Sequence, residues 1–226
     1  DYTAKEIEKL IIKLIEKNYN WTFGEDFNLN ISLMLTPEIS LCGASLKNVP
    51  MHVDRKIETV PGSIKSSLAN VLINLSELKA TDSMLDPMCG SGIIAIESAK
   101  YTDKCIAGDI DKSIIHLAKK NSETKPVKIE FHIWDAKKTE LAKNSIDKII
   151  SNLPLGKLVK LETEFYSEFI AEMHRISKNK SRWVFLTNQD KLLKKIIKDF
   201  ADLSIINSIA ITNSGLESTI LVIEKA

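Results

Sequence analysis

Apolar residues recur along the chain with two different spacings. In residues 4–17 they follow a helical period among Lys and Glu, which predicts an amphipathic helix. Residues 29–35 and 39–42 instead alternate apolar and polar positions on either side of Thr36-Pro37-Glu38, which predicts a two-stranded hairpin. Helix and hairpin together predict a small N-terminal α+β extension over residues 1–45. Residues 46–80 are then expected to form a connecting segment that contains Pro61-Gly62 and a helix over 63–78.

From Ser83 onward, short apolar runs alternate with longer helical patterns. This alternation is typical of a parallel sheet with crossover helices. The predicted strands cover residues 84–85, 105–107, 129–133, 146–150 and 183–186, and the predicted helices cover 93–99, 113–120, 164–176 and 191–200. The final runs, 203–211 and 219–223, are joined only by Asn213-Ser214-Gly215, so they must pair as a hairpin. Residues 81–226 are therefore predicted to form an α/β, Rossmann-like, seven-stranded sheet with the last strand antiparallel.

Composition excludes several classes of protein. The chain of 226 residues is 44% hydrophobic and 27% charged, with 31 Lys+Arg against 30 Asp+Glu, so it is neither disordered nor strongly basic. No stretch approaches the roughly 20 apolar residues of a membrane helix, which leads us to expect a soluble, cytoplasmic protein with no membrane association. Neither the three cysteines nor the four histidines have metal-ligand spacing, so no metal site is predicted.

The strongest local motif is Asp86-Pro87-Met88-Cys89-Gly90-Ser91-Gly92, between a predicted strand and a predicted helix. Glycines at such a turn let the backbone approach a ligand at the helix N-terminus. The spacing suits a nicotinamide dinucleotide or S-adenosylmethionine equally well. Charge favours the second, because Asp86 repels a pyrophosphate and attracts the ammonium of an aminocarboxypropyl group.

Two further aspartates end the next two strands. Asp109 is placed to accept hydrogen bonds from ribose hydroxyls, and Asp135 to accept one from an adenine amine. Trp134 is interpreted as a packing residue, and a position lining the adenine pocket is the alternative. The predicted cofactor-binding set is Asp86, Met88, Cys89, Gly90, Gly92, Asp109, Ile110, Asp135, Ala136 and Asn152.

A second motif, Ser151-Asn152-Leu153-Pro154-Leu155-Gly156-Lys157, follows the fourth strand. The side-chain oxygen of Asn152 and the carbonyl of Leu153 each suit one N–H of an exocyclic base amine, and together they aim its lone pair at a methyl donor. Pro154 holds the preceding residue extended, and Gly156 leaves room for the base. Asn152, Leu153, Pro154 and Gly156 are therefore the predicted catalytic motif.

The combination of these motifs resembles the catalytic domain of the THUMP-associated RNA guanine-N2 methyltransferases, and the archaeal transfer-RNA branch in particular. The resemblance covers residues from about 46 to the C-terminus and implies a class I methyltransferase fold, S-adenosylmethionine as cofactor, and structured RNA, with tRNA expected, as substrate. Residues before about 46 resemble the end of a THUMP module. This part of the chain is far shorter than an intact THUMP module. RNA docking is then expected from this truncated part, from a segment absent from the chain, or from a protein partner.

The substrate side carries one departure from the family pattern. Leu155 stands where the family has Tyr or Phe, a ring expected to stack on the target base, and such stacking is worth about 1–3 kcal/mol. Leu155 and Lys157 are the predicted substrate-binding residues, with Lys160 and residues 178–182 as further candidates for phosphate contacts. Phe165, Phe169 and Met173 are interpreted as core residues.

Two alternatives remain open at this point. One is amine methylation of DNA adenine or of a protein glutamine, although Leu153 and Leu155 both depart from the Pro-Pro-aromatic pattern of those relatives. The other is a cofactor-binding or RNA-binding subunit that has lost catalysis, which Leu155 and the short N-terminal part favour.

Overall fold

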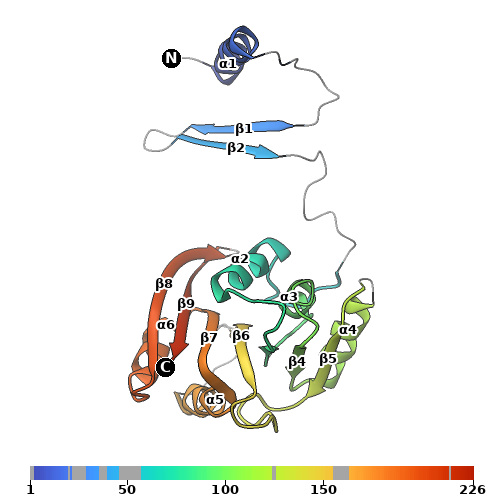
Figure 1. The fold of residues 1–226 in the computed structure, drawn as a ribbon, viewed down its shortest axis with the longest axis vertical. Coiled ribbons are helices and arrows are strands. Elements are labelled where there is room, and N and C mark those ends of the chain that lie inside the picture. The colour runs from blue at the N-terminus through green and yellow to red at the C-terminus, as the bar shows by residue number, and fades with distance from the viewer. Residues whose placement is uncertain are drawn as a thin grey trace. The chain divides into compact units, whose positions relative to one another are not determined.

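The computed structural model describes residues 3–19, 21, 29–35, 40–45, 57–123, 126–154, 163–213 and 215–226. Contacts divide the chain into two compact units, residues 1–53 and 54–226 (Figure 1). None of the helices in these described ranges is long and apolar enough to cross a membrane.

The N-terminal unit contains the predicted helix and hairpin. Helix α1 (Ala4–Asn18) begins with a capping box, because the Thr3 hydroxyl accepts from the Glu6 backbone N–H and the Glu6 carboxylate accepts from the Thr3 backbone N–H. Strand β1 (Asn30–Leu35) pairs antiparallel with β2 (Ser40–Ser45). Both predicted elements are confirmed, although Ile39 lies outside the described residues.

The larger unit is built on a seven-stranded sheet, with the order β5-β4-β3-β6-β7-β9-β8 over the described residues. Its strands are β3 (Met84–Asp86), β4 (Cys105–Asp109), β5 (Ile129–Ile133), β6 (Ile146–Asn152), β7 (Ser177–Thr187), β8 (Leu203–Asn213) and β9 (Leu216–Lys225). Strands β3 to β7 are parallel, and β9 is antiparallel to both of its neighbours, β7 and β8. The predicted α/β fold with an antiparallel last strand is confirmed, and that strand lies inside the sheet rather than at its edge.

Helices cover both faces of this sheet (Figure 1). Side chains of α2 (Ser66–Ser76), α3 (Ile93–Ser98) and α4 (Lys112–Ser122) share one apolar cluster with the sheet, and those of α5 (Thr163–Ile176) and α6 (Asp190–Ile197) share the other. Successive residues of β7 alternate between the clusters, with Val184 and Leu186 in the first and Trp183 and Phe185 in the second. Central strands therefore read as continuous apolar runs because both of their faces are buried.

The topology decides where a ligand can bind. From central β3 the chain runs outward through β4 and β5, and it then returns to β6 on the other side of β3. The crossover connections thus leave in opposite directions above the carboxyl ends of β3 and β6. Open α/β sheets hold ligands in the crevice that forms at this point, and Asp86 and Asn152 are the last residues of these two strands.

Helix α2 is predicted to be part of the core of the larger unit rather than a free connection. Leu72 is fully buried against the sheet, whereas the neighbouring Val71 is 46% exposed. We expect Leu72→Ala to lower the free energy of unfolding by about 2–5 kcal/mol. Val71→Ala, the matched control on the same helix, should change it by less than about 1 kcal/mol. Chemical denaturation of both variants checks this, and equal effects of the two substitutions would contradict the packing of α2.

Candidate functional site

A cavity of about 600 Å³ lies at the carboxyl ends of the central strands. It is lined by the loop after β3, the ends of β4 and β6, the segment after β5, a turn before α2 and one residue of α5. The lining includes nearly every described residue predicted for the cofactor and the catalytic motif: Asp86, Met88, Cys89, Gly90, Asp109, Ile110, Asp135, Ala136, Asn152, Leu153 and Pro154. The fold thus brings two motifs about 60 residues apart in sequence into one site.

The glycine loop after β3 is held in shape by backbone hydrogen bonds. Gly90 and Gly92 have φ values of +51° and +84°, which favour glycine. The Cys89 N–H donates to the Gly108 carbonyl over 2.8 Å, and the Gly90 N–H donates to the Asp109 carboxylate over 3.1 Å. Gly92 does not line the cavity, because its α-carbon faces α4, where an added Cβ would lie 3.1 Å from the Ala118 Cβ. Gly90 opens the loop toward the cavity, while Gly92 allows close helix packing.

Asp86 is a buried carboxylate at the centre of the sheet. Its side chain is 1% exposed, and Oδ1 accepts hydrogen bonds from the Ser151 hydroxyl at 2.8 Å and the Met88 N–H at 3.4 Å. Burial raises the pKa of Asp86 to about 7, because two neutral donors do not replace the lost hydration of the charged form. A bound cation would restore the ionised state at neutral pH.

Asp109 and Asp135 present further acceptor oxygens along the same edge. Asp109 Oδ2 accepts from Gly90 and Oδ1 accepts from the Asp111 N–H at 3.1 Å. Asp135 Oδ1 accepts from the Lys137 N–H at 2.9 Å. A carboxylate oxygen can accept more than one hydrogen bond, so these contacts orient both groups and leave acceptor capacity for ligand hydroxyls or amines. Ile110, 71% exposed, supplies apolar surface beside them.

Trp134 packs behind the cavity wall, against Gly108, and does not line the cavity. Its indole Nε1 donates to the Pro87 carbonyl over 3.1 Å, which ties the glycine loop to the segment after β5. The ring stacks on His132 at 4.9 Å and lies directly against Gly108, where an added Cβ would come within 2.1 Å of it. Gly108 is therefore required by the indole, a role that the sequence motif did not reveal.

Asn152 has an oriented carboxamide. Its Nδ2 donates to the Gly62 carbonyl over 2.9 Å, whereas its buried Oδ1 has no hydrogen-bond partner among the described residues. A buried carbonyl oxygen without a donor is costly, which makes it a place where a ligand N–H is expected. Leu153 is fully buried and its N–H donates to the Leu186 carbonyl, while the Tyr166 hydroxyl donates to the Pro154 carbonyl. The remaining residues of this motif, Leu155, Gly156 and Lys157, lie outside the described residues.

Two parts of the cavity wall were not identified from the sequence. The turn of residues 60–63 lies beside Asn152, and the Pro61-Gly62 pair at its centre is the sequence signal from which a β-turn could have been predicted. Phe165 on α5, interpreted as core, is only partly buried and lines the cavity, whereas Phe169 and Met173 are fully buried as expected. Helical spacing placed all three on the apolar face, but it did not show which of them would line the cavity.

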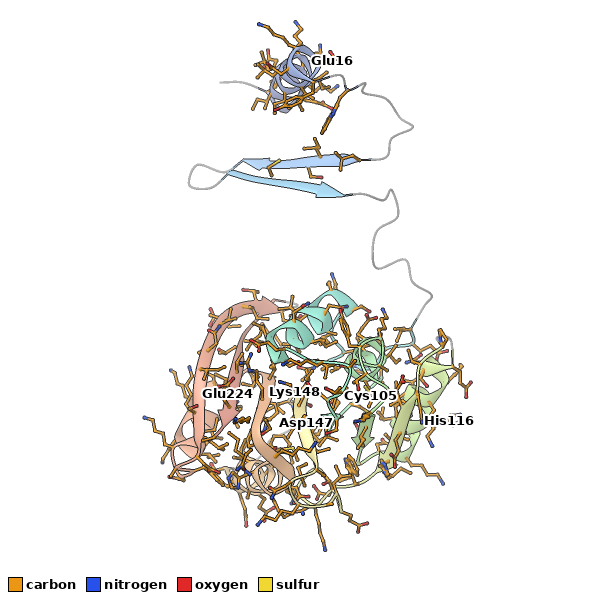
Figure 2. All side chains as sticks on the ribbon, viewed as in Figure 1. Glu16, Cys105, His116, Asp147, Lys148 and Glu224 are labelled. Atoms are coloured by element: carbon orange, nitrogen blue, oxygen red, sulfur yellow. The ribbon has the colours of Figure 1, made fainter. Side chains whose placement is uncertain are left out.

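The basic candidates at residues 178–182 are placed away from the cavity. Lys178 contacts Asp147 at 2.7 Å, and the guanidinium of Arg182 binds the carboxylates of Glu77 and Glu224. Figure 2 labels Asp147 on β6 and Glu224 on β9 in this cluster. Both cations sit in the amino-terminal half of β7, at the other end of the sheet from Asn152, so these candidates for phosphate contacts are paired with carboxylates and do not line the cavity. Lys160 lies outside the described residues.

No group of three or more His, Cys, Asp or Glu side chains in the described part of the chain is arranged to hold a metal ion. Cys89 and Cys105 are buried free thiols whose pKa values burial raises, Cys105 to about 12, so both remain protonated at neutral pH.

A family model supports a methyltransferase reading of this site. The model of UPF0020, described as an RMKL-like methyltransferase domain, matches residues 54–216. The matched region contains the glycine loop and the Asn152 motif and corresponds closely to the larger compact unit.

Curated relatives carry RNA-modifying activities in their names. The chain is 30% identical over 194 residues to the human U6 snRNA (guanine-N(2))-methyltransferase THUMPD2, covering 84% of this chain and 38% of that protein. It is 28% identical over 181 residues to the tRNA (guanine(6)-N2)-methyltransferase of Methanocaldococcus jannaschii, covering 61% of this chain and 48% of that protein. The chain thus spans less than half the length of these relatives.

Solved structures share the fold. TrmN from Thermus thermophilus superposes with a TM-score of 0.73 at 22% identity, covering 100% of this chain and 68% of that one. SMU.472, a methyltransferase-like protein complexed with SAH, gives a TM-score of 0.60 at 18% identity, covering 74% of this chain and 54% of that one. At these identities the comparison establishes the architecture alone.

Gly108 is predicted to be indispensable because of Trp134. We expect Gly108→Ala to lower the free energy of unfolding by about 1–3 kcal/mol, since the new methyl group overlaps the indole. Thermal or denaturant unfolding of the single and double variants measures the coupling. The double variant Gly108→Ala with Trp134→Leu should lose less than the sum of the two single variants, because the smaller side chain removes the overlap. Simple additivity would contradict the proposed packing.

Proposed function

The chain belongs to the RMKL-like methyltransferase-domain family, and on that premise we propose that it transfers a methyl group from S-adenosylmethionine to the exocyclic N2 of a guanosine in structured RNA, with transfer RNA as the expected substrate. The observation that carries the proposal is the buried, unpartnered Oδ1 of Asn152 at the wall of the cavity. The activities named for the human and archaeal relatives support the choice of guanosine N2.

The carboxylates that line the cavity fit the proposed cofactor. When bound, S-adenosylmethionine supplies an electrophilic methyl group on a sulfonium. Asp86 is suited to its ammonium, Asp109 to the ribose hydroxyls and Asp135 to the adenine amine. Ile110, Ala136 and the Phe165 ring supply apolar surface for the purine. Three carboxylates around one cavity disfavour a pyrophosphate, so the same loop is poorly suited to a dinucleotide.

On the substrate side, this chain's residues orient an amine rather than deprotonate it. A guanine N2 is a poor nucleophile because its lone pair is delocalised into the ring. Asn152 Oδ1 and the Leu153 carbonyl each accept one N–H, which turns the lone pair out of the ring plane. The amine becomes acidic once it is alkylated, so its proton can leave to water without a dedicated base.

RNA capture is a separate part of the proposal. The formal charge of the whole chain is only +1, so bulk electrostatic attraction for RNA is weak. We propose that residues 1–45, the part that resembles the end of a THUMP module, dock the RNA together with further protein segments or a partner. A cytoplasmic location, where transfer RNA is modified, is part of the same proposal.

The activity is tested by incubating unmodified cellular RNA, and in parallel DNA and protein, with radiolabelled S-adenosylmethionine and the full chain, followed by nucleoside and amino-acid analysis. We expect label in N2-methylguanosine. Asn152→Ala should lower transfer by about 100-fold or more while the affinity for S-adenosylhomocysteine changes little, because the side chain acts on the nucleophile. Label in DNA adenine or in protein glutamine would replace the proposed substrate with the alternative one. Cofactor binding without transfer to any of these acceptors would favour a non-catalytic subunit.

The raised pKa of Asp86 predicts a pH dependence of cofactor affinity. Protonation removes the charge that attracts the ammonium, so affinity for S-adenosylhomocysteine should fall by about tenfold between pH 7.5 and pH 6. Isothermal titration calorimetry at both pH values measures the change. In Asp86→Asn the affinity should be low and nearly the same at both pH values.

Unfolding of the protein would not explain such a loss of affinity. Because the pKa of Asp86 in the folded state lies above its unfolded value of 3.8, the ionised group destabilises the ligand-free fold. Its contribution to the free energy of unfolding therefore improves as the pH falls through about 7. An affinity that is constant between pH 6 and 7.5 in the wild-type chain would contradict the role given to Asp86.

A further inference from the structure

Residues 58–63 are here called the strap, and its last four residues, Val60 to Ser63, line the cavity beside Asn152. The strap ends in a tight turn in which the Ser63 N–H donates to the Val60 carbonyl over 3.0 Å. Pro61 and Gly62 occupy the centre of this turn, and Gly62 has a φ of +87°. A turn with these residues points the carbonyl of its glycine in one fixed direction.

Side chains from two other segments anchor the strap. Asn121 on α4 is 3% exposed; its Oδ1 accepts from the Glu58 N–H at 3.0 Å, and its Nδ2 donates to the carbonyls of Glu58 and Ser91, both at 2.9 Å. The Ser63 hydroxyl lies 2.9 Å from the Ser91 hydroxyl and accepts from the Val60 N–H at 3.1 Å. The strap is thus fixed to α4 and to the glycine loop and does not depend on Asn152 for its position.

The strap determines which way the Asn152 carboxamide faces. A carbonyl oxygen only accepts hydrogen bonds, so the 2.9 Å contact with Gly62 requires Nδ2, not Oδ1, on that side. Because the carboxamide is planar, this places Oδ1 on the opposite side, where it is buried and has no partner among the described residues. The orientation with a free acceptor is therefore imposed before any ligand arrives.

We propose that the Gly62 carbonyl is the positioning group that presents Asn152 Oδ1 to the substrate amine. The inference rests on the proposed function, since it concerns the acceptor that the amine would use. It assigns a role to each end of the carboxamide, with Nδ2 held by the strap and Oδ1 reserved for the substrate. An acceptor that is already aligned avoids the entropy of ordering it during the reaction.

The substitution Asn152→Asp removes the donor Nδ2 and keeps an oxygen at the position of Oδ1. The carboxylate keeps an acceptor oxygen for the amine, but it repels the Gly62 carbonyl and has no proton to donate. Once protonated, the acid again offers one donor and one acceptor. In full-chain protein with saturating cofactor and RNA, we expect kcat of this variant to be about tenfold or more below wild type at pH 8 and to recover as the pH falls toward 6.

The kcat of the wild-type chain should not rise as the pH falls from 8 to 6. Asn74→Asp is the matched control, because Asn74 also donates to a backbone carbonyl, that of Asn70 at 2.8 Å, but at an exposed site on α2. This control should keep the wild-type rate and pH profile. If Asn152→Asp turned over like the wild type at pH 8, or followed the same pH profile at a lower rate, the positioning role of Gly62 would be refuted.

A second measurement does not need catalysis. In ¹⁵N-labelled, ligand-free full chain, the side-chain amide of Asn152, assigned by its disappearance in Asn152→Asp, should exchange with solvent about tenfold or more slowly than that of Asn207, an exposed residue whose Nδ2 donates to none of the described residues. Equal exchange rates would overturn the inference while leaving the proposed function intact. A protected Asn152 amide in a protein that methylates no RNA would overturn the proposed function alone.

Discussion

The buried carboxylate of Asp86 is the constraint on which the rest of the site depends. It ends the three-residue strand β3 at the centre of the sheet and is 1% exposed. Among the described residues, only the Ser151 hydroxyl and the Met88 N–H donate to it, and burial raises its pKa to about 7. A charge held this way is stabilised by a cation, and the position next to the glycine loop lets a small ligand supply one.

The loops around Asp86 are tied together so that the cavity keeps its shape. Asp109 holds the Gly90 N–H, and Trp134 holds the Pro87 carbonyl. The first contact joins the loop after β3 to the end of the neighbouring strand β4, and the second joins the same loop to the segment after β5. The cavity is therefore shaped by backbone geometry, and its acidic side chains retain acceptor capacity for binding.

The two sides of the site meet at Asn152. Its backbone lies on β6, which pairs with β3, so the carboxamide lies beside the proposed cofactor position by virtue of the sheet alone. Its orientation, in contrast, comes from a segment that precedes α2 in the sequence. Gly62 and Asn152 lie 90 residues apart in the sequence, yet one hydrogen bond connects the strap to the carboxamide that is proposed to bind the amine. The proposed presentation of Asn152 thus depends on a contact with a residue outside both motifs.

The sequence by itself determined the order of helices and strands, the antiparallel last strand and the two motifs, because period, glycine and proline act locally. It also placed Asp86, Asp109, Asp135 and Asn152 at strand ends, which parallel topology brings to one edge. Only the tertiary structure decided that Gly108 must leave room for Trp134, that Phe165 lines the cavity, and that Arg182 is held by carboxylates at the other end of the sheet. Those roles arise from contacts between segments distant in sequence, and no local pattern records which segments will meet.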